Sequence, residues 1–483
     1  LDAPTFFGTP ATRSALVTLI SGKGSHIANG TVVFVGDIGW IKETGATEIA
    51  DMPDFVPFGT PTPNHYKENT TQGATLMTDA FLAAAHGNGT GGSSSSTGRK
   101  VRLLAEKYAV DAMVFTSDGL TFDGAGKQAT QVLCVNTTGD TFTFGDGASK
   151  FFRPGLKNMT IRMASGVEKT SGAHVSIVRG RGGVIENVDI EDFYDGIKLT
   201  GTDRLMTYNV VGTNLNRTLK CGKFISQLYH TGATEKCTDN KFTLVRTASS
   251  AILGDVGMYI ESADGSHLVS CNFNNFDKAM HIHADSANPA IGGIMCVNTY
   301  FDESNDYNLL LDGDDTIQNI KFTGCYFRAS AGDAVNVASA ITVDGALFTG
   351  CSFENADEMA VNWISQSSKQ IVFTGSMFDD NLDDGTTTTE FYYNGDGLTM
   401  TGSAFSGGWA GGTCVTLGAN SSGCLVSRGN YAASTNGTVV TDSGTGNNVI
   451  QLAAFVADAA TGSAAEINAI RDALVTAGLM AAS

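Results

Sequence analysis

The second half of the chain carries a degenerate repeat, and this repeat limits what the chain can fold into. Each unit begins with apolar or β-branched residues, continues with small ones and closes on an aromatic residue. The units are Leu268 to Phe273, Cys296 to Phe301, Phe322 to Phe327, Phe348 to Phe353, Phe373 to Phe378, Met400 to Phe405 and Val426 to Tyr431. The period is roughly 26 residues, which indicates stacked supersecondary units that bury their apolar faces against one another.

The composition of the units favours strands and turns over helices, because β-branched and aromatic residues alternate with Gly, Ser, Thr and Asn. One coil of a parallel β-helix matches the period, whereas a propeller blade needs about 40 residues. Weaker copies at 156–161, 185–190, 210–215 and 239–244 extend the series upstream. We therefore predict an all-β chain with a right-handed parallel β-helix of about eleven coils, on the order of 50 Å long.

A second strand follows the first in each coil, and apolar residues occupy its alternate positions. Alternation with a period of two places one set of side chains in the core and the other outside. The outward column comprises Lys198, Tyr259, His281, Leu310, Asn336 and Asn362. Two positions further along the strand, three successive coils present Glu261, His283 and Asp312.

The charge balance excludes two classes of partner. The chain has 30 Lys and Arg against 49 Asp and Glu, a net charge of −19. Binding to nucleic acid or to an anionic membrane surface needs basic residues, so we expect neither. We expect no membrane insertion either, because there is no run of about 18 apolar residues.

The nine cysteines do not indicate a disulfide framework. Cys271, Cys325 and Cys351 recur at one position of the repeat, where other coils carry Thr299, Ser376 or Ser403. A stack of small residues explains them, although Cys325 and Cys351 lie on adjacent coils and could pair. No spacing typical of a metal site occurs, and we expect no cofactor and no metal.

The chain divides into four predicted regions. Residues 1–70 hold most of the prolines and are expected to form a separate adaptor or particle-attachment unit. Residues 71–150 include a helix pattern over 74–86 and the first strands of the β-helix. The helix is expected to cap the open end of the solenoid. Residues 151–445 form the β-helix, and 446–483 a C-terminal segment with a short helix.

Several features of this order together resemble a known family. A helix at Ala74 to His86, a Gly- and Ser-rich loop at 91–96, short strands and then Leu120 to Gly126 look like the N-terminal signature of the pectate-lyase-like tailspikes of bacteriophages. Asn64-His65-Tyr66 is similar to the lead-in of that signature, although residues 67–73 replace its usual acidic Gly-Asp-Gly run. Residues 463–474 resemble the closing helix of phage tail fibre proteins. The resemblance covers about 64–480.

This resemblance implies a homotrimeric parallel β-helix in the phage tail of the virion, outside the host cell. It implies that the protein binds, and often cleaves, a bacterial surface polysaccharide. The N-terminal region would then attach to a phage tail or baseplate adaptor protein.

The C-terminal segment supports oligomerisation from its own pattern. Ser463 and Glu466 form a capping box. The apolar residues that follow lie along one helical stripe: Ile467, Ile470, Leu474 and Leu479. Such a stripe suits a trimer seam or a helix folded back on the last coil, and both alternatives remain open.

The first candidate site is the group around the outward column. Glu261, His283 and Asp312 are the predicted catalytic residues, because a glycosidase needs two carboxylates at a set spacing. Tyr259, His281 and His267 are predicted to bind substrate, since aromatic and imidazole rings stack on and hydrogen-bond to sugars. The alternative is that all of them are ordinary solvated or subunit-interface residues.

A second outward column follows the closing aromatic of the repeat. It reads Asp302, Arg328, Glu354 and Asp379, with Glu303 and Asp380 beside it. Its alternating charges favour a ladder of ion pairs that stabilises the stacked turns. Glu354, Asp379 and Asp380 are the alternative catalytic group.

Three functions of different class follow. The first is a tailspike that binds and depolymerises a capsule, exopolysaccharide or O-antigen during host adsorption, as an endo-acting glycoside hydrolase rather than a lyase. The second is a non-enzymatic receptor-binding fibre that only binds glycan. The third is a secreted pectinase-like enzyme, which the adaptor-like and fibre-like ends disfavour.

Overall fold

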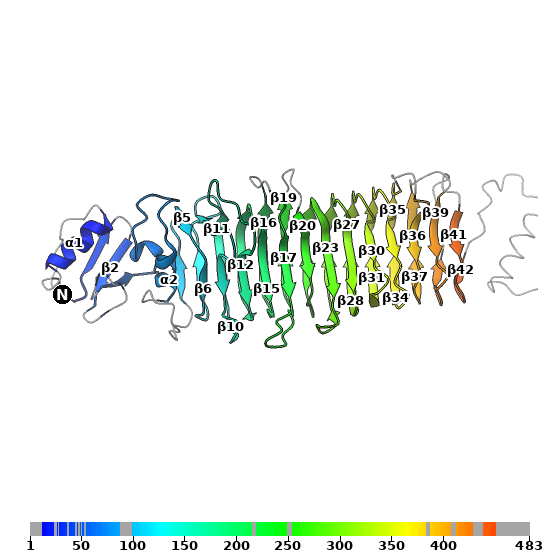
Figure 1. The fold of residues 1–483 in the computed structure, drawn as a ribbon, viewed down its shortest axis with the longest axis horizontal. Helices are drawn as coiled ribbons and strands as arrows, with labels where there is room; N and C mark the ends of the chain where they lie inside the picture. The colour runs from blue at the N-terminus through cyan, green and yellow to red at the C-terminus, as the bar shows by residue number, and fades with distance from the viewer. Residues whose placement is uncertain are drawn as a thin grey trace, which may run out of the picture.

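The computed structural model describes residues 12–450, apart from 24–26, 28, 36–37, 44–45, 47–48, 50, 53–54, 87–98, 215–218, 249–253, 383–386, 407–411 and 428–437. Most of these residues form a solenoid of stacked parallel strands, which runs as a rod from a small N-terminal unit (Figure 1). The predicted parallel β-helix is confirmed. The C-terminal helix predicted within 463–480 lies outside the described residues.

One side of the solenoid is a sheet of 13 strands whose neighbours pair in parallel. In chain order these are β6 (Met113–Phe115), β9 (Phe142–Phe144), β12 (Ala173–Val178), β15 (Asp195–Thr200), β17 (Lys223–Leu228), β20 (Gly254–Ile260), β23 (Phe276–Ala284), β27 (Tyr307–Gly313), β30 (Val335–Val337), β33 (Val361–Trp363), β36 (Thr389–Tyr393), β39 (Thr413–Leu417) and β41 (Thr438–Asp442). Eleven of them, all except β6 and β9, lie after residue 151, as the repeat predicts. This sheet is named the long sheet below.

The remaining strands complete each coil, and they are named the second set. They are β4 (Lys100–Arg102), β5 (Lys107–Val110), β7 (Thr121–Asp123), β8 (Gln131–Cys134), β11 (Gly155–Met163), β14 (Val184–Glu191), β16 (Met206–Thr213), β18 (Lys241–Thr243), β19 (Arg246–Ala248), β21 (His267–Val269), β22 (Asn272–Asn274), β24 (Ile291–Gly292), β25 (Met295–Val297), β26 (Tyr300–Asp302), β28 (Thr316–Thr323), β29 (Tyr326–Arg328), β31 (Thr342–Thr349), β32 (Ser352–Glu354), β34 (Lys369–Thr374), β35 (Met377–Asp379), β37 (Leu398–Thr401), β38 (Ala404–Ser406), β40 (Leu425–Ser427) and β42 (Asn448–Ile450). Two further short strands, β10 (Phe151–Phe152) and β13 (Gly180–Arg181), pair with each other.

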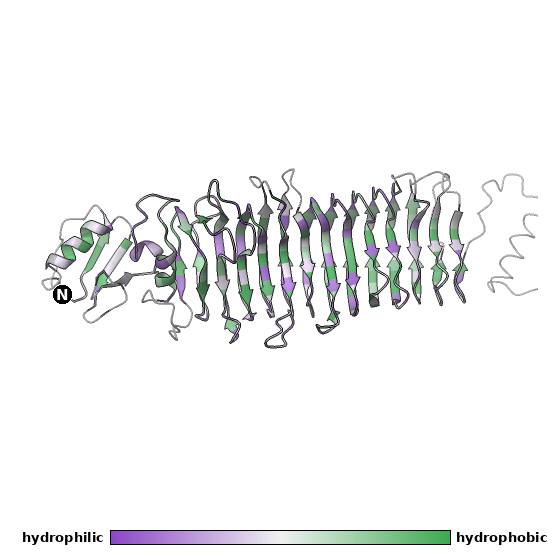
Figure 2. Cartoon of the chain, in the orientation of Figure 1, coloured by the Kyte–Doolittle hydropathy of each residue, from purple (hydrophilic) through white to green (hydrophobic). Residues whose placement is uncertain are grey.

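The closing aromatics of the repeat form the spine of the core. Phe327 stacks on Phe353 with ring centroids 4.9 Å apart, and Phe353 stacks on Phe378 at 4.8 Å. Green and purple residues alternate along the strands in Figure 2, as expected for strands with one buried face. The backbone explains why the repeat has a glycine. Gly324 and Gly350 both take a φ of 59°, a left-handed conformation that favours glycine.

The cysteines follow the sequence interpretation. All nine are buried, and none forms a disulfide. Cys325 Sγ lies 3.4 Å from the carbonyl oxygen of Cys296, and Cys351 Sγ lies 3.4 Å from that of Phe322. They therefore act as small core residues.

Helix α2 (Thr78–His86) covers the first coil. Its Phe81 packs on Tyr108, Phe122 and Phe142 with centroids 5.5, 5.7 and 6.3 Å away. The helix thereby shields apolar side chains that no preceding coil covers. The predicted capping helix is confirmed, although it begins at Thr78 rather than at Ala74.

The N-terminal unit has its own core. Helix α1 (Arg13–Lys23) lies beside an antiparallel sheet of β1 (Val32–Val35), β2 (Ile38–Lys42) and β3 (Phe55–Phe58). Leu16, Trp40 and Phe55 are fully buried there. The short 3-10 helix η2 (Pro63–His65) follows, and the amide of Arg102 donates to the carbonyl of Pro61 at 2.8 Å. Residues from Pro61 onward therefore contact the first coil rather than belonging to the N-terminal unit alone.

Among the described residues, no helix is long and apolar enough to span a membrane.

Candidate functional site

The candidate site lies on the outward face of three neighbouring strands of the long sheet, β20, β23 and β27. In β23, Met280 and Ile282 are buried in the core, so His281 and His283 point outward. The parallel register aligns Tyr259, His281 and Leu310 in one row, and it aligns His283 with Asp312 in the next. Glu261 directly follows β20 and continues that second row. The predicted outward alignment is confirmed.

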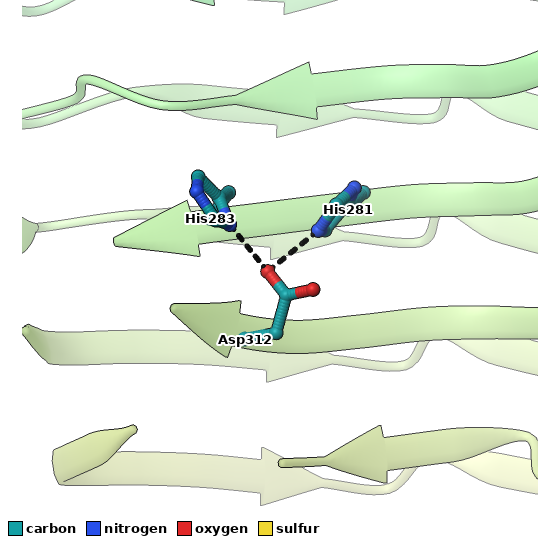
Figure 3. Close-up of side chains that lie close together, drawn as sticks. All are labelled: His281, His283 and Asp312. Carbon is teal, nitrogen blue, oxygen red and sulfur yellow. Dashed lines mark hydrogen bonds and ion pairs between the residues drawn. The ribbon is translucent and has the colours of Figure 1, made fainter. Parts of the chain in front are cut away.

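His281, His283 and Asp312 converge on a single oxygen atom. His281 Nε2 lies 2.8 Å from Asp312 Oδ1, and His283 Nδ1 lies 2.6 Å from the same oxygen (Figure 3). Each ring donates a hydrogen bond when that nitrogen carries the proton. The side chains are 15%, 35% and 30% exposed, so solvent and small molecules can reach them. These three residues are named the His–His–Asp cluster.

The cluster keeps its carboxylate ionised. Burial by itself would raise the pKa of Asp312, but hydrogen bonds and positive charge from His281 and His283 outweigh it and hold this pKa below its ordinary value. A charged Asp312 favours the tautomers that donate to it. In a neutral ring of that tautomer, the other nitrogen, His283 Nε2 or His281 Nδ1, can accept a hydrogen bond.

Tyr259 supports the cluster from the side. Its ring meets His281 edge-on at 5.2 Å between centroids and stacks on His283 at 6.5 Å. Lys223 Nζ lies 3.7 Å from the centroid of the same ring. Burial and the negative charges of Glu261 and Asp312 raise the pKa of Tyr259, so its hydroxyl stays protonated.

Tyr259 does not offer a free ring face to a sugar. Only 9% of the residue is exposed, because Lys223 and the two imidazoles pack against the ring. The sequence pattern placed Tyr259 outward correctly, but it could not reveal these neighbours. Lys223 was missed because β17 departs from the pattern of the other coils.

Glu261 stands apart from the cluster's hydrogen bonds. Its Oε1 accepts from Asn288 Nδ2 at 3.2 Å. Because β20 and β27 are separated by one strand, the backbones of Glu261 and Asp312 are about 10 Å apart. Both side chains lie on the outward face.

The structure places His267 elsewhere. It is an exposed residue on β21, in the second set, where it aligns with Lys241 and Met295. It therefore lies on a different sheet from the His–His–Asp cluster. This removes the structural basis for grouping it with Tyr259 and His281.

The alternative group also belongs to the second set. Asp302, Arg328, Glu354 and Asp379 align in one row, as the repeat predicts. Asp379 Oδ1 accepts from Ser406 Oγ at 2.6 Å, and Asp380 follows with a φ of 50°. The described residues include no ion pair between Arg328 and either neighbour, so the predicted ladder of direct ion pairs is not formed there.

Two exposed tyrosines beside this row escaped the sequence reasoning. Tyr300 and Tyr326 are 44% and 39% exposed, and their rings stack with centroids 4.6 Å apart and an interplanar angle of 2°. They lie two residues before Asp302 and Arg328, on the same outward face. The repeat could have revealed this pair, because both tyrosines directly precede the closing phenylalanine and therefore occupy the same position on adjacent coils.

Comparisons with known proteins find relatives by structure alone. No family model matches the chain, and no curated protein matches its sequence. A mutant tailspike protein of E. coli bacteriophage HK620 in complex with a pentasaccharide superimposes with a TM-score of 0.54 and 10% identity, over 81% of this chain and 80% of that one. A second mutant of the tailspike gives 0.56 and 11%, over 76% and 71%.

The A-module of the Azotobacter vinelandii mannuronan C-5 epimerase AlgE6 gives a TM-score of 0.50 and 13% identity, over 80% of this chain and 97% of that one. At such low identity these likenesses concern the fold. They show that the chain shares its fold with these proteins.

Proposed function

We propose that this chain is a phage tailspike that recognises a bacterial surface polysaccharide during host adsorption and depolymerises it. The observation that carries the proposal is the partly exposed His–His–Asp cluster, set beside Glu261 on a rigid face of the solenoid. The structural neighbours, a tailspike in complex with a pentasaccharide and a mannuronan epimerase, support a glycan as the ligand. The N-terminal signature described above supports the phage role.

The proposed chemistry is hydrolysis by two carboxylates. With backbones about 10 Å apart, Glu261 and Asp312 can bring their carboxyl groups to the roughly 6.5–9.5 Å that suits an inverting hydrolase. Asp312 is held ionised, which fits a base that activates water. Glu261 would donate the proton to the leaving oxygen, and His283 Nε2 would hydrogen-bond to the sugar.

The decisive experiment incubates the chain with the host's capsule, exopolysaccharide or O-antigen. New reducing ends without ultraviolet absorbance indicate a hydrolase, whereas absorbance of an unsaturated uronate indicates a lyase. Glycan binding without either product would identify a non-enzymatic receptor-binding fibre. Cleavage by a chain that never attaches to a particle would favour a secreted pectinase-like enzyme.

Two isosteric variants test the residues. Glu261→Gln and Asp312→Asn should each lower the cleavage rate at least about 100-fold while glycan binding and the melting temperature stay close to those of the unaltered chain. Glu186→Gln, on β14 in the second set, is the matched control and should cleave normally.

Full activity in both variants would contradict this assignment. The site would then move to Glu354, Asp379 and Asp380, beside the exposed Tyr300 and Tyr326 pair, or to a groove between subunits. Burial of Glu261 and Asp312 in a trimer interface would contradict it as well.

A further inference from the structure

The His–His–Asp cluster has the donor set of a transition-metal site. One ligand atom from each residue lies within 4.8 Å of the other two. The distances from Asp312 Oδ1 to the two imidazole nitrogens are 2.8 and 2.6 Å. Ligand atoms around a tetrahedral Zn²⁺ with bonds of about 2.0–2.1 Å lie about 3.3 Å apart, so each of these two distances would lengthen by roughly half an ångström when the ion binds.

The fold holds the three ligands on one rigid surface. His281 and His283 are two residues apart on β23, so both side chains leave the same face of the strand. Asp312 faces them from β27, in register with His283. Backbone ladders on both sides fix these strands, and the ligand arrangement therefore exists before any ion binds.

The chemistry of the donors selects the ion. Two imidazoles and one carboxylate suit Zn²⁺ and its first-row neighbours, whereas Ca²⁺ and Mg²⁺ prefer a shell of oxygen atoms. The side chains are 15–35% exposed, which leaves an entry path and room for a further ligand. Glu261, in the same row, adds negative charge near the cluster and favours a cation.

We propose that His281 Nε2, His283 Nδ1 and Asp312 Oδ1 bind one divalent transition-metal ion, with Zn²⁺ as the best match. The ion would bind His281 Nε2 and His283 Nδ1, and each neutral ring would then carry its proton on its other nitrogen. The sequence pattern did not indicate a metal site, because a His-x-His pair on a strand is short and its third ligand lies on another coil. The inference concerns metal binding alone and holds whether or not the chain cleaves a glycan.

The test uses the full chain after treatment with a chelator and dialysis. Titration with Co²⁺ should produce visible absorbance typical of a nitrogen- and oxygen-ligated ion and should saturate at one ion per chain. Zn²⁺ should displace it. His281→Ala, His283→Ala and Asp312→Asn should each weaken binding at least about 10-fold.

His267→Ala is the matched control, since it removes an exposed histidine from another sheet. It should bind Co²⁺ like the unaltered chain, and the melting temperature of each metal-free variant reports on folding. Equal loss of binding in His267→Ala, or no saturable absorbance in the unaltered chain, would overturn the proposal.

A parallel glycan assay separates this inference from the proposed function. Zn²⁺ binding with no glycan cleavage would uphold the metal site and contradict a depolymerase. Cleavage by the chelator-treated chain with no Zn²⁺ binding would overturn the metal site and leave the depolymerase standing.

Discussion

Glu390, on β36, shows how one buried side chain can make the stability of a coil depend on pH. It is 1% exposed, and its Oε1 accepts a hydrogen bond from Asn381 Nδ2 at 2.9 Å. Burial raises its pKa from 4.5 to about 7, although the hydrogen bond from Asn381 lowers it. The folded state therefore binds the proton more tightly than the unfolded state does.

This difference gives a signed prediction. The stability that the protonated Glu390 contributes is fully present below about pH 4.5 and is lost as the pH rises through about 7. Glu390→Gln should have the same free energy of unfolding as the unaltered chain at pH 4 and a larger one by about 3 kcal/mol at pH 8, because Gln keeps the acceptor and carries no charge. Thermal melting of both chains at the two pH values measures this. A melting-temperature difference that does not change with pH would contradict it.

At the scale of the element, β17 is the strand that departs from the repeat. The register places Gln227 in line with the core residues Ile260 and Ile282. Gln227 is fully buried, and within the described chain neither its amide oxygen nor its amide nitrogen has a hydrogen-bond partner. A buried amide without a partner costs about 1–3 kcal/mol.

Restoring the apolar pattern of β17 should therefore stabilise the solenoid. We expect Gln227→Leu to raise the free energy of unfolding by about 1–3 kcal/mol, visible as a higher melting temperature. Ser226→Ala, at the neighbouring outward position of β17, is the control and should change stability less. A lower melting temperature for Gln227→Leu would mean that the amide has a partner, such as an internal water molecule.

At the scale of the whole molecule, the rod has one end closed by α2 and a separate unit before it (Figure 1). The core of Leu16, Trp40 and Phe55 belongs to that unit. Residues from Pro61 onward bond to the first coil. This arrangement supports the proposal that the N-terminal unit attaches the chain to a phage tail or baseplate adaptor.

Two measurements on the whole molecule follow. A chain that lacks residues 1–58 should keep its solenoid and bind glycan with unchanged affinity, because the His–His–Asp cluster lies on β23 and β27 and keeps its neighbours.

Light scattering should give a particle mass three times the chain mass of 50.4 kDa, as a homotrimer requires. A monomer at micromolar concentration, or loss of glycan binding on truncation, would contradict these expectations.

Much of this architecture could be predicted from the sequence. The closing phenylalanines identified the coils because every coil must fill the same core position. The alternation around His281 and His283 placed them outward, and the register then aligned His283 with Asp312. The helix over 74–86 was predicted to cap the end because the first coil has apolar residues and no preceding coil to cover them.

Only the tertiary structure decided which side chains meet. Contacts across coils bring His281 and His283 to one oxygen of Asp312 and place Lys223 over the ring of Tyr259. The stacking of coils also places His267 on a different sheet. The turns between strands differ in length, so spacing along the sequence does not by itself show which residues of neighbouring coils lie side by side. The stacked strands decide that alignment. The repeat in the amino-acid sequence determined the solenoid because burial acts at every coil, and the packing between coils decided the site.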